Sequence, residues 1–267
     1  MKLKKNKKDV ENALMYLMNK YNIQSSAPIQ LYGPAQQGIL SLQPGYEFFD
    51  TWLEKNEIPL LIWRMKRKFT ELRKIVLDGV IEEVCLFRIS SMGSRDKWSL
   101  ATLLYREMDL LEFIGNGKIV SIQAIFNNDR AGNVILKLDN DILCSIEVSV
   151  QLPVNSILQD RHEIIGRRGV ASDLVVDTQV AQSSVYSFTE KGEIRYTDVD
   201  MELYGFDDLQ IDHIRAAFQV LKSPDLITEW RKQHNHLVSL VKAIFKSDKE
   251  CKKINFKNES TYTYETN

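Results

Sequence analysis

Residues 67–115 read RKFTELRKIVLDGVIEEVCLFRISSMGSRDKWSLATLLYREMDLLEFIG, and this stretch decides the fold of the chain. It predicts a helix over 67–78, a strand over 83–90 and a charged loop at 94–98. A second amphipathic helix follows and ends near residue 115. The order of helix, strand, loop and helix is typical of a protein in which helices cover a sheet.

The chain before this stretch alternates between strands and helices. A single apolar stripe predicts a helix over 9–21, and Ala27-Pro28-Ile29-Gln30-Leu31-Tyr32 has the pattern of a short strand. A second helix is predicted around 44–56, and a continuous apolar strand at 59–63, of the kind buried in a parallel sheet. The β–α–β rhythm of residues 1–65 therefore indicates part of a doubly wound sheet.

The chain after residue 115 is rich in strands. In residues 142–150 every second side chain is apolar, whereas Ser145, Glu147 and Ser149 share the opposite face, so one face of the sheet is packed and the other is more polar. Turn residues at 127–129 and 139–141 predict antiparallel neighbours. Further strands are predicted at 118–126, 132–138, 161–166, 173–177, 184–188 and 193–197, and two helices follow, the second beginning at Ser223-Pro224-Asp225.

Composition limits the class of protein. The chain has 267 residues, of which 44% are hydrophobic and 27% charged, with a net charge of −1, so a nucleic acid or an anionic membrane bound by overall charge is not expected. No apolar run is long enough to span a membrane, and no secretory signal is recognised. Cys85, Cys144 and Cys251 have no metal-ligand spacing. These observations predict a cytoplasmic protein.

Several short motifs occur in an order and spacing that a known family shares. They are Arg67-Lys68-Phe69, the helix end Asp78-Gly79-Val80-Ile81, Met108-Asp109-Leu110-Leu111, Ile164-Ile165-Gly166-Arg167-Arg168-Gly169 and Asp225-Leu226-Ile227-Thr228-Glu229-Trp230. Together they resemble the glucose–fructose oxidoreductase/inositol dehydrogenase/MocA (Gfo/Idh/MocA) family of sugar and polyol dehydrogenases, over most of residues 9–246.

This resemblance implies an α/β (α+β) fold in three parts. Residues 1–66 would be a partial, Rossmann-like βα remnant of a nucleotide-binding domain. Residues 67–246 would be the substrate and oligomerisation domain, a large, mainly antiparallel open sheet with helices on one face. Residues 247–267 would be a polar tail.

The chain departs from the family pattern where the chemistry is expected. The resemblance implies an NAD or NADP cofactor held by a GxGxxG loop, but none of the 12 glycines are spaced that way near the start, so the first half of the nucleotide fold is expected to be missing. The family's Glu-Lys-Pro motif aligns with Tyr32-Gly33-Pro34, and Gly33 has no side chain. The family's Asp and His, four residues apart on a helix, align with Thr102 and Arg106, and Asp109 is retained. Arginine stays protonated and cannot act as the general base.

The sequence therefore predicts a catalytically degenerate protein without an intact NAD(P) site, which binds a sugar or sugar nucleotide or acts as a partner subunit. The possible substrate cleft comprises Tyr32, Lys97, Trp98, Thr102, Arg106 and Asp109. The alternative is an active NAD(P)-dependent sugar or polyol dehydrogenase, either with Tyr32, Lys97 and Asp109 transferring the proton or completed by another polypeptide. A fragment would explain the missing half but not Gly33 and Arg106.

Other patterns predict structural roles or an interface. No GxSxG elbow or P-loop is present, and His162, His213, His234 and His236 lack metal-pair spacing, so they are expected to be structural or solvated. The basic run of Arg64, Lys66, Arg67 and Lys68 is expected to be a solvated helix start. The mildly polar sheet face predicts a homo-oligomer, or a hetero-oligomer with a full-length paralogue, formed through the open sheet.

Overall fold

The computed structural model describes residues 6–33, 36–49, 53–173, 184–189, 192–197, 203 and 205–256. The chain divides into two compact units. Unit 1 comprises residues 1–66 and 199–238, and unit 2 comprises residues 67–198 and 239–267. The first boundary falls between Lys66 and Arg67, at the start of the stretch 67–115, and residues 199–238 belong with the N-terminal part of the chain.

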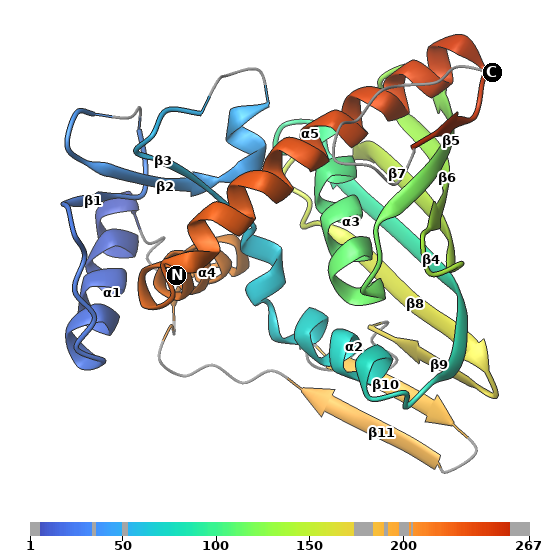
Figure 1. Cartoon of the computed structure of the whole chain (residues 1–267), viewed down its shortest axis with the longest axis horizontal. Helices are drawn as coiled ribbons and strands as arrows, with labels where there is room; N and C mark the ends of the chain where they lie inside the picture. Colours follow the sequence, from blue (N-terminus) through green and yellow to red (C-terminus); the bar gives the residue numbers. More distant parts are fainter. Residues whose placement is uncertain are drawn as a thin grey trace. The chain divides into compact units, whose positions relative to one another are not determined.

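Unit 1 contains a small parallel sheet with helices. Its strands are β1 (Ile29–Gln30), β2 (Leu40–Pro44) and β3 (Glu57–Leu60), in that order across the sheet (Figure 1). The helices α1 (Lys7–Lys20) and α4 (Asp208–Lys222) pack on each other, with the rings of Tyr21 and Phe218 5.5 Å apart. Two 3-10 turns, η1 (Gly45–Phe48) and η2 (Ile62–Met65), and the first part of α5 (Asp225–Glu250) complete the unit.

The helix predicted around 44–56 is wrong. Pro44 ends β2, η1 is a single 3-10 turn, and residues 53–56 are not helical. The physical reason is that the sheet holds both ends of this segment: Pro44 is the last residue of the central strand β2, and β3 begins at Glu57, with the two strands paired from Ser41↔Glu57 to Pro44↔Leu60. The ring of Tyr46, within η1, stacks on Trp63 of η2. Residues 50–52 of the predicted helix lie outside the described residues.

Unit 2 is built on a large mixed sheet. Within the described residues nine strands follow the order β11-β10-β9-β8-β4-β7-β6-β5-β12, and each pair is antiparallel except β4–β7 (Figure 1). The strands are β4 (Glu82–Ser94), β5 (Ile119–Asn127), β6 (Ala131–Leu138), β7 (Leu143–Leu152), β8 (Gln159–Arg167), β9 (Gly169–Ser172), β10 (Ser184–Thr189), β11 (Gly192–Thr197) and β12 (Ile254–Asn255). This confirms the predicted large, mainly antiparallel sheet. The strand predicted at 173–177 falls almost entirely outside the described residues, and Asp173 itself is not in a strand.

Two helices of unit 2 are α2 (Arg67–Leu77) and α3 (Leu100–Gly115), which pack on each other, and α3 also covers β4, β6 and β7. Ser99 caps α3 by accepting a hydrogen bond from Thr102 N at 3.1 Å, and Asn116 ends the helix with a left-handed φ of 51°. No helix in the described part of the chain has the length and apolarity that a membrane span requires.

The sheet of unit 2 has one packed face and one open face, as the alternation in 142–150 predicted. Along β7, the side chains of Cys144, Ile146, Val148 and Val150 are buried, and those between them are exposed or partly exposed. The open face also carries apolar side chains, because Ile125 is 70%, Ile135 55% and Leu143 48% exposed.

Candidate functional site

A hollow of about 290 Å³ lies in unit 1 at the carboxyl ends of the parallel strands. Tyr32 and Gly33 follow β1, and Tyr46 and Glu47 follow β2. In open α/β sheets this edge is where ligands bind, because the loops that leave the strands meet there. The polar side chains that line this strand-end hollow are those of Lys7, Tyr32, Gln43, Tyr46, Glu47, Asp207, Gln210 and His213.

Aromatic contacts hold the walls of the strand-end hollow in place. The ring of Tyr46 stacks on the buried Trp63 with centroids 5.4 Å apart, and Tyr32 meets His213 edge-on at 5.2 Å. The side-chain amide of Gln43 donates to the carbonyl of Gly33 and to Ser41 Oγ at 2.8 Å. Gly33 has a φ of +104°, a conformation that a residue with a side chain rarely adopts, so glycine is required by this turn.

His213 is a neutral hydrogen-bonding group in the wall of the hollow. Its Nε2 lies 2.8 Å from the carbonyl oxygen of Leu42, and because a carbonyl only accepts, Nε2 carries the proton. Burial lowers the pKa of His213 to about 4, against the smaller opposing effect of Leu42. The imidazole is therefore neutral at pH 7, and its Nδ1 lone pair is an acceptor.

The two tyrosines of the strand-end hollow keep their protons. Burial raises the pKa of Tyr32, and the carboxylates of Asp207 and Glu11 raise it further. Burial, followed by the charge of Glu47, raises the pKa of Tyr46. Both hydroxyls are therefore donors at neutral pH. The alternative in which Tyr32 transfers the alcohol proton needs a lowered pKa, so these shifts do not support it.

Arg106, the residue aligned with the family's general base, lies in a buried ionic network in unit 2. Its side chain is 2% exposed and pairs with the carboxylates of Glu107 and Asp160. Lys68 Nζ lies 2.9 Å from Asp160 Oδ1 and 2.8 Å from Asp173 Oδ2. Lys68 comes from α2, Arg106 and Glu107 from α3, and Asp160 from β8, so the network joins three elements.

His162 completes the network between two carboxylates. Its Nδ1 lies 2.7 Å from Asp173 Oδ2 and its Nε2 2.8 Å from Glu107 Oε2. Burial by itself would lower the pKa of His162, but Asp173 and Glu107 raise it to about 9. The imidazole is therefore protonated at neutral pH, and three cations face three carboxylates, so the network is neutral as a whole.

The network does not have the arrangement of a metal site. Oxygen and nitrogen atoms of Asp160, His162 and Asp173 lie within 4.8 Å of one another, as metal ligands do. However, Lys68 Nζ bridges the two aspartates, and both ring nitrogens of His162 are bonded to carboxylates. A ligand histidine needs one free lone pair, so these residues fit a set of internal ion pairs better than a divalent cation.

The remaining predicted cleft residues are placed differently from one another. Lys97 lies at the surface, with Nζ 3.4 Å from the carbonyl oxygen of Asn155, and Trp98, in the same loop between β4 and α3, is buried. Thr102 shares a hydrogen bond of 2.9 Å with the Ser99 hydroxyl at the start of α3, and Asp109 is fully buried in α3. Of the six predicted residues, these four and Arg106 belong to unit 2, and Tyr32 belongs to unit 1.

Sequence reasoning missed the ionic network. Lys68 and Arg64 were expected at a solvated helix start, but both side chains are buried. A signal was present in β8, where Asp160, His162 and Ile164 occupy alternate positions and so share one face. Charged residues that share one face of a strand with a buried apolar residue indicate an internal ion pair.

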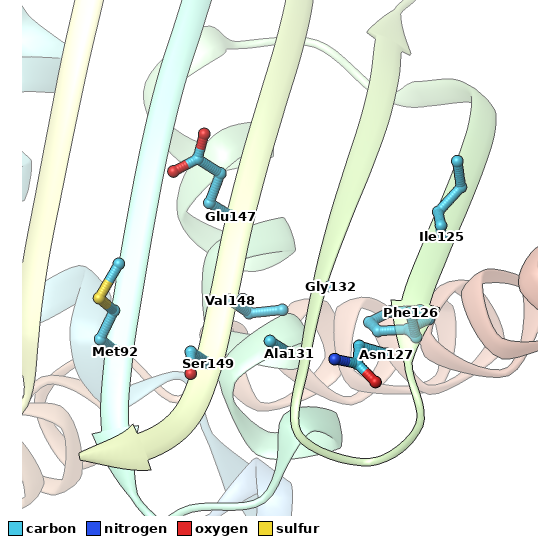
Figure 2. Close-up of a pocket in the computed structure, with 9 residues that line it drawn as sticks. All are labelled: Met92, Ile125, Phe126, Asn127, Ala131, Gly132, Glu147, Val148 and Ser149. Atoms are coloured by element: carbon cyan, nitrogen blue, oxygen red, sulfur yellow. The ribbon is translucent and has the colours of Figure 1, made fainter.

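A second, larger hollow of about 420 Å³ lies on the open face of the unit 2 sheet (Figure 2). Figure 2 shows Met92 on one side and Ile125 on the other, with the small residues Ser149, Ala131 and Gly132 between them. Glu147 is its one titratable side chain among the described residues. This open-face depression lacks converging polar groups, so it has the character of a contact surface and not of a site for chemistry.

Comparison with known proteins identifies the fold. No protein-family model and no curated protein matches the sequence. Among solved structures, an oxidoreductase from Agrobacterium radiobacter in complex with NAD+, L-tartaric acid and magnesium has a TM-score of 0.60 at 13% identity, covering 74% of this chain and 64% of that one. A levoglucosan dehydrogenase in complex with NADH and levoglucosan has a TM-score of 0.59 at 11% identity, covering 74% and 65%.

The similar structures include a regulator. The transcriptional regulator Gal80p from Kluyveromyces lactis has a TM-score of 0.58 at 16% identity, covering 76% of this chain and 63% of that one. These neighbours are of the Gfo/Idh/MocA type, which confirms the predicted resemblance at the level of fold. This chain spans less than two thirds of the length of each of these three structures.

Proposed function

We propose that this protein, which has the oxidoreductase fold of sugar and polyol dehydrogenases, binds a small sugar-like ligand and does not transfer hydride. The observation that carries this proposal is the position of Arg106, paired with Glu107 and Asp160 inside the core of unit 2. The same fold includes a protein described as a transcriptional regulator, so the fold does not by itself imply catalysis.

The chemistry at Arg106 opposes hydride transfer. Oxidation of an alcohol needs a group that accepts the hydroxyl proton, and such a general base contributes roughly 10²–10⁴-fold in rate. Burial would lower the pKa of Arg106, but Glu107 and Asp160 raise it above its ordinary value, so the guanidinium stays charged at any ordinary pH. A buried, doubly paired guanidinium has no lone pair to offer and serves the packing of α3.

The strand-end hollow supports ligand binding. Two tyrosine hydroxyls donate, His213 Nδ1 and the Glu47 carboxylate accept, and the ring of Tyr46 offers an apolar surface. Aromatic faces with converging hydrogen-bonding groups suit sugar rings, whose C–H faces are apolar and whose hydroxyls point outward. The volume of about 290 Å³ suits a ligand of the size of one monosaccharide.

The groups at this sheet edge do not fit a dinucleotide. A pyrophosphate binds where backbone N–H groups at a helix N-terminus are available and no negative charge opposes it. At the start of α4, the Asp207 carboxylate already accepts from Gln210 N at 2.9 Å, and Glu47 adds a second carboxylate. The proposal therefore involves no NAD or NADP step, although two of the similar structures are complexes with NAD+ or NADH.

Calorimetric titration together with a turnover assay tests the proposal. We expect a monosaccharide or polyol from a panel to bind, and no absorbance change at 340 nm when NAD+ or NADP+ is added. Tyr46→Phe removes one hydroxyl from the strand-end hollow and should weaken binding, whereas Tyr16→Phe, at an exposed position of α1, should leave it unchanged. Turnover of any member of the panel, or the absence of binding by all of them, contradicts the proposal.

We further propose that the open face of the unit 2 sheet, including the open-face depression, is covered by a second copy of the chain. Ile125, Ile135 and Leu143 are exposed there on neighbouring strands. A two-fold axis would place this same patch of the two copies face to face, so the exposed apolar side chains of one copy would cover those of the other. Light scattering that gives the mass of the monomer at high concentration would contradict this proposal.

A further inference from the structure

The strand-end hollow carries a net negative charge. Among its described lining residues, Glu47 and Asp207 are carboxylates, Lys7 is the one cation, and His213 is neutral. Glu11 lies close enough to Tyr32 to act on its hydroxyl together with Asp207. The negative potential therefore extends to the Tyr32 hydroxyl, and it favours a cation over an anion in the hollow.

A cation already occupies part of this surface. Lys7 Nζ lies 5.0 Å from the centroid of the Tyr32 ring, in the geometry of a cation–π contact. Lys7 is the first residue of α1, where the positive end of the helix dipole disfavours a cation. The carboxylates and the aromatic face of the hollow offset this unfavourable interaction of Lys7 with the helix dipole. The hollow therefore provides a binding position for an ammonium group.

We infer that the strand-end hollow binds a small ligand through a protonated amine, with Glu47, Asp207 and the Tyr32 ring as its recognition groups and Lys7 as the internal competitor. The ligand class is an aminated sugar or polyol. This inference rests on the proposed function and deepens it, because it adds the charge of the ligand to its size and hydroxyl pattern.

The recognition groups differ in how much each can discriminate. The two carboxylates distinguish an ammonium from a neutral hydroxyl by charge, and salt weakens this electrostatic attraction. The Tyr32 ring binds an ammonium but not a hydroxyl, because only the cation is attracted by the ring quadrupole. Tyr46 and His213 form hydrogen bonds with the ligand's hydroxyl groups. They therefore contribute equally to the binding of an aminated sugar and of a neutral sugar.

Three ligands of the same ring size test the inference by calorimetric titration at pH 7 and low salt. They are glucosamine, N-acetylglucosamine and glucose, which carry an ammonium, a neutral acetamide and a neutral hydroxyl at the same carbon. We expect glucosamine to bind at least ten times more tightly than the other two. Equal or weaker binding of glucosamine overturns the inference and leaves the proposed function standing, whereas no binding of any sugar contradicts the proposed function itself.

Charge-neutral variants assign the preference to the named residues. Asp207→Asn should keep the N-cap of α4, since asparagine is as good an N-cap residue as aspartate. Asp207→Asn and Glu47→Gln should each reduce the preference for glucosamine several-fold. Lys7→Gln removes the internal competitor and should tighten glucosamine binding without changing glucose binding. Glu71→Gln, on α2 of unit 2, is the matched control and should have no effect. A preference that survives both carboxylate variants would overturn the assignment.

Discussion

The Nε2 atom of His162 lies 2.8 Å from Oε2 of Glu107, and neither side chain is more than 1% exposed. This pair connects β8 to α3 through a charge that water does not reach. Its existence explains why Arg106, next to Glu107 in the chain, is turned into the core. Arg106 and His162 both contact the Glu107 carboxylate there.

Removal of the His162 charge should destabilise the protein strongly. His162→Gln leaves Glu107 and Asp173 without their shared cation, and breaking a buried ion pair costs about 3–5 kcal/mol. Urea unfolding followed by circular dichroism measures this loss. Arg167→Gln is the control, because the pair of Arg167 and Glu83 is exposed and should contribute about 0–1 kcal/mol. Similar losses for both variants would contradict the structural role of the network.

The buried ionic network should make the stability of the protein depend on pH in the alkaline range. The pKa of His162 is raised from 6.5 to about 9, so its stabilising effect is complete below pH 6.5 and is lost as the pH rises through 9. The difference in unfolding free energy between wild type and His162→Gln should therefore fall by up to about 3 kcal/mol over this range. A difference that is constant from pH 6 to pH 10 would show that His162 is not protonated in the fold.

The buried carboxylate of Glu107 should make the stability of the protein depend on pH in the acid range. Burial would raise the pKa of Glu107, but Arg106 and His162 lower it below its ordinary value of 4.5. The stabilisation by Glu107 is present above pH 4.5 and is lost as the pH falls through the lowered pKa. Glu107→Gln should therefore lose stability at pH 6 and lie close to wild type in strong acid, which unfolding curves at several pH values will measure.

Arg106 should not be replaceable by lysine. Its two Nη atoms serve different carboxylates, Glu107 and Asp160, and one ammonium on a thinner side chain cannot reproduce that planar fork. We expect Arg106→Lys to lose about 1–3 kcal/mol of unfolding free energy. Arg167→Lys, in the pair with Glu83 in which both side chains are exposed, is the matched substitution and should be nearly neutral. Equal stability of the two variants would contradict this account.

The open face of the sheet should control self-association. Ile125→Glu places a charge within the proposed interface and should shift the protein towards the monomer, as measured by light scattering. Its effect on folding should be within about 0.5 kcal/mol, since the side chain is exposed. Val154→Glu is the control, because Val154 is equally exposed but lies beyond the end of β7. Dissociation by the control alone would place the interface elsewhere.

Regular periodicity made much of the fold predictable. The alternation along 142–150 correctly assigned Cys144 and Val148 to the packed face, and the turn residues correctly indicated antiparallel neighbours. The helix predicted around 44–56 was wrong, because a proline such as Pro44 fits the first turn of a helix as well as an extended segment, so the local pattern did not decide between them. Pairing of β2 with both neighbours, a contact between distant residues, made residues 40–44 a strand.

The sequence by itself determined the identity of the groups at the family positions: Gly33 has no side chain and Arg106 cannot accept a proton, whatever the structure around them. Only the tertiary structure decided where these groups act. It placed Arg106 in a buried network with Asp160, 54 residues away, and gathered Lys7, Glu47 and Asp207 around one hollow. The physical reason is that burial and electrostatic pairing depend on contacts between distant residues, whereas the chemistry of a side chain is fixed by its type.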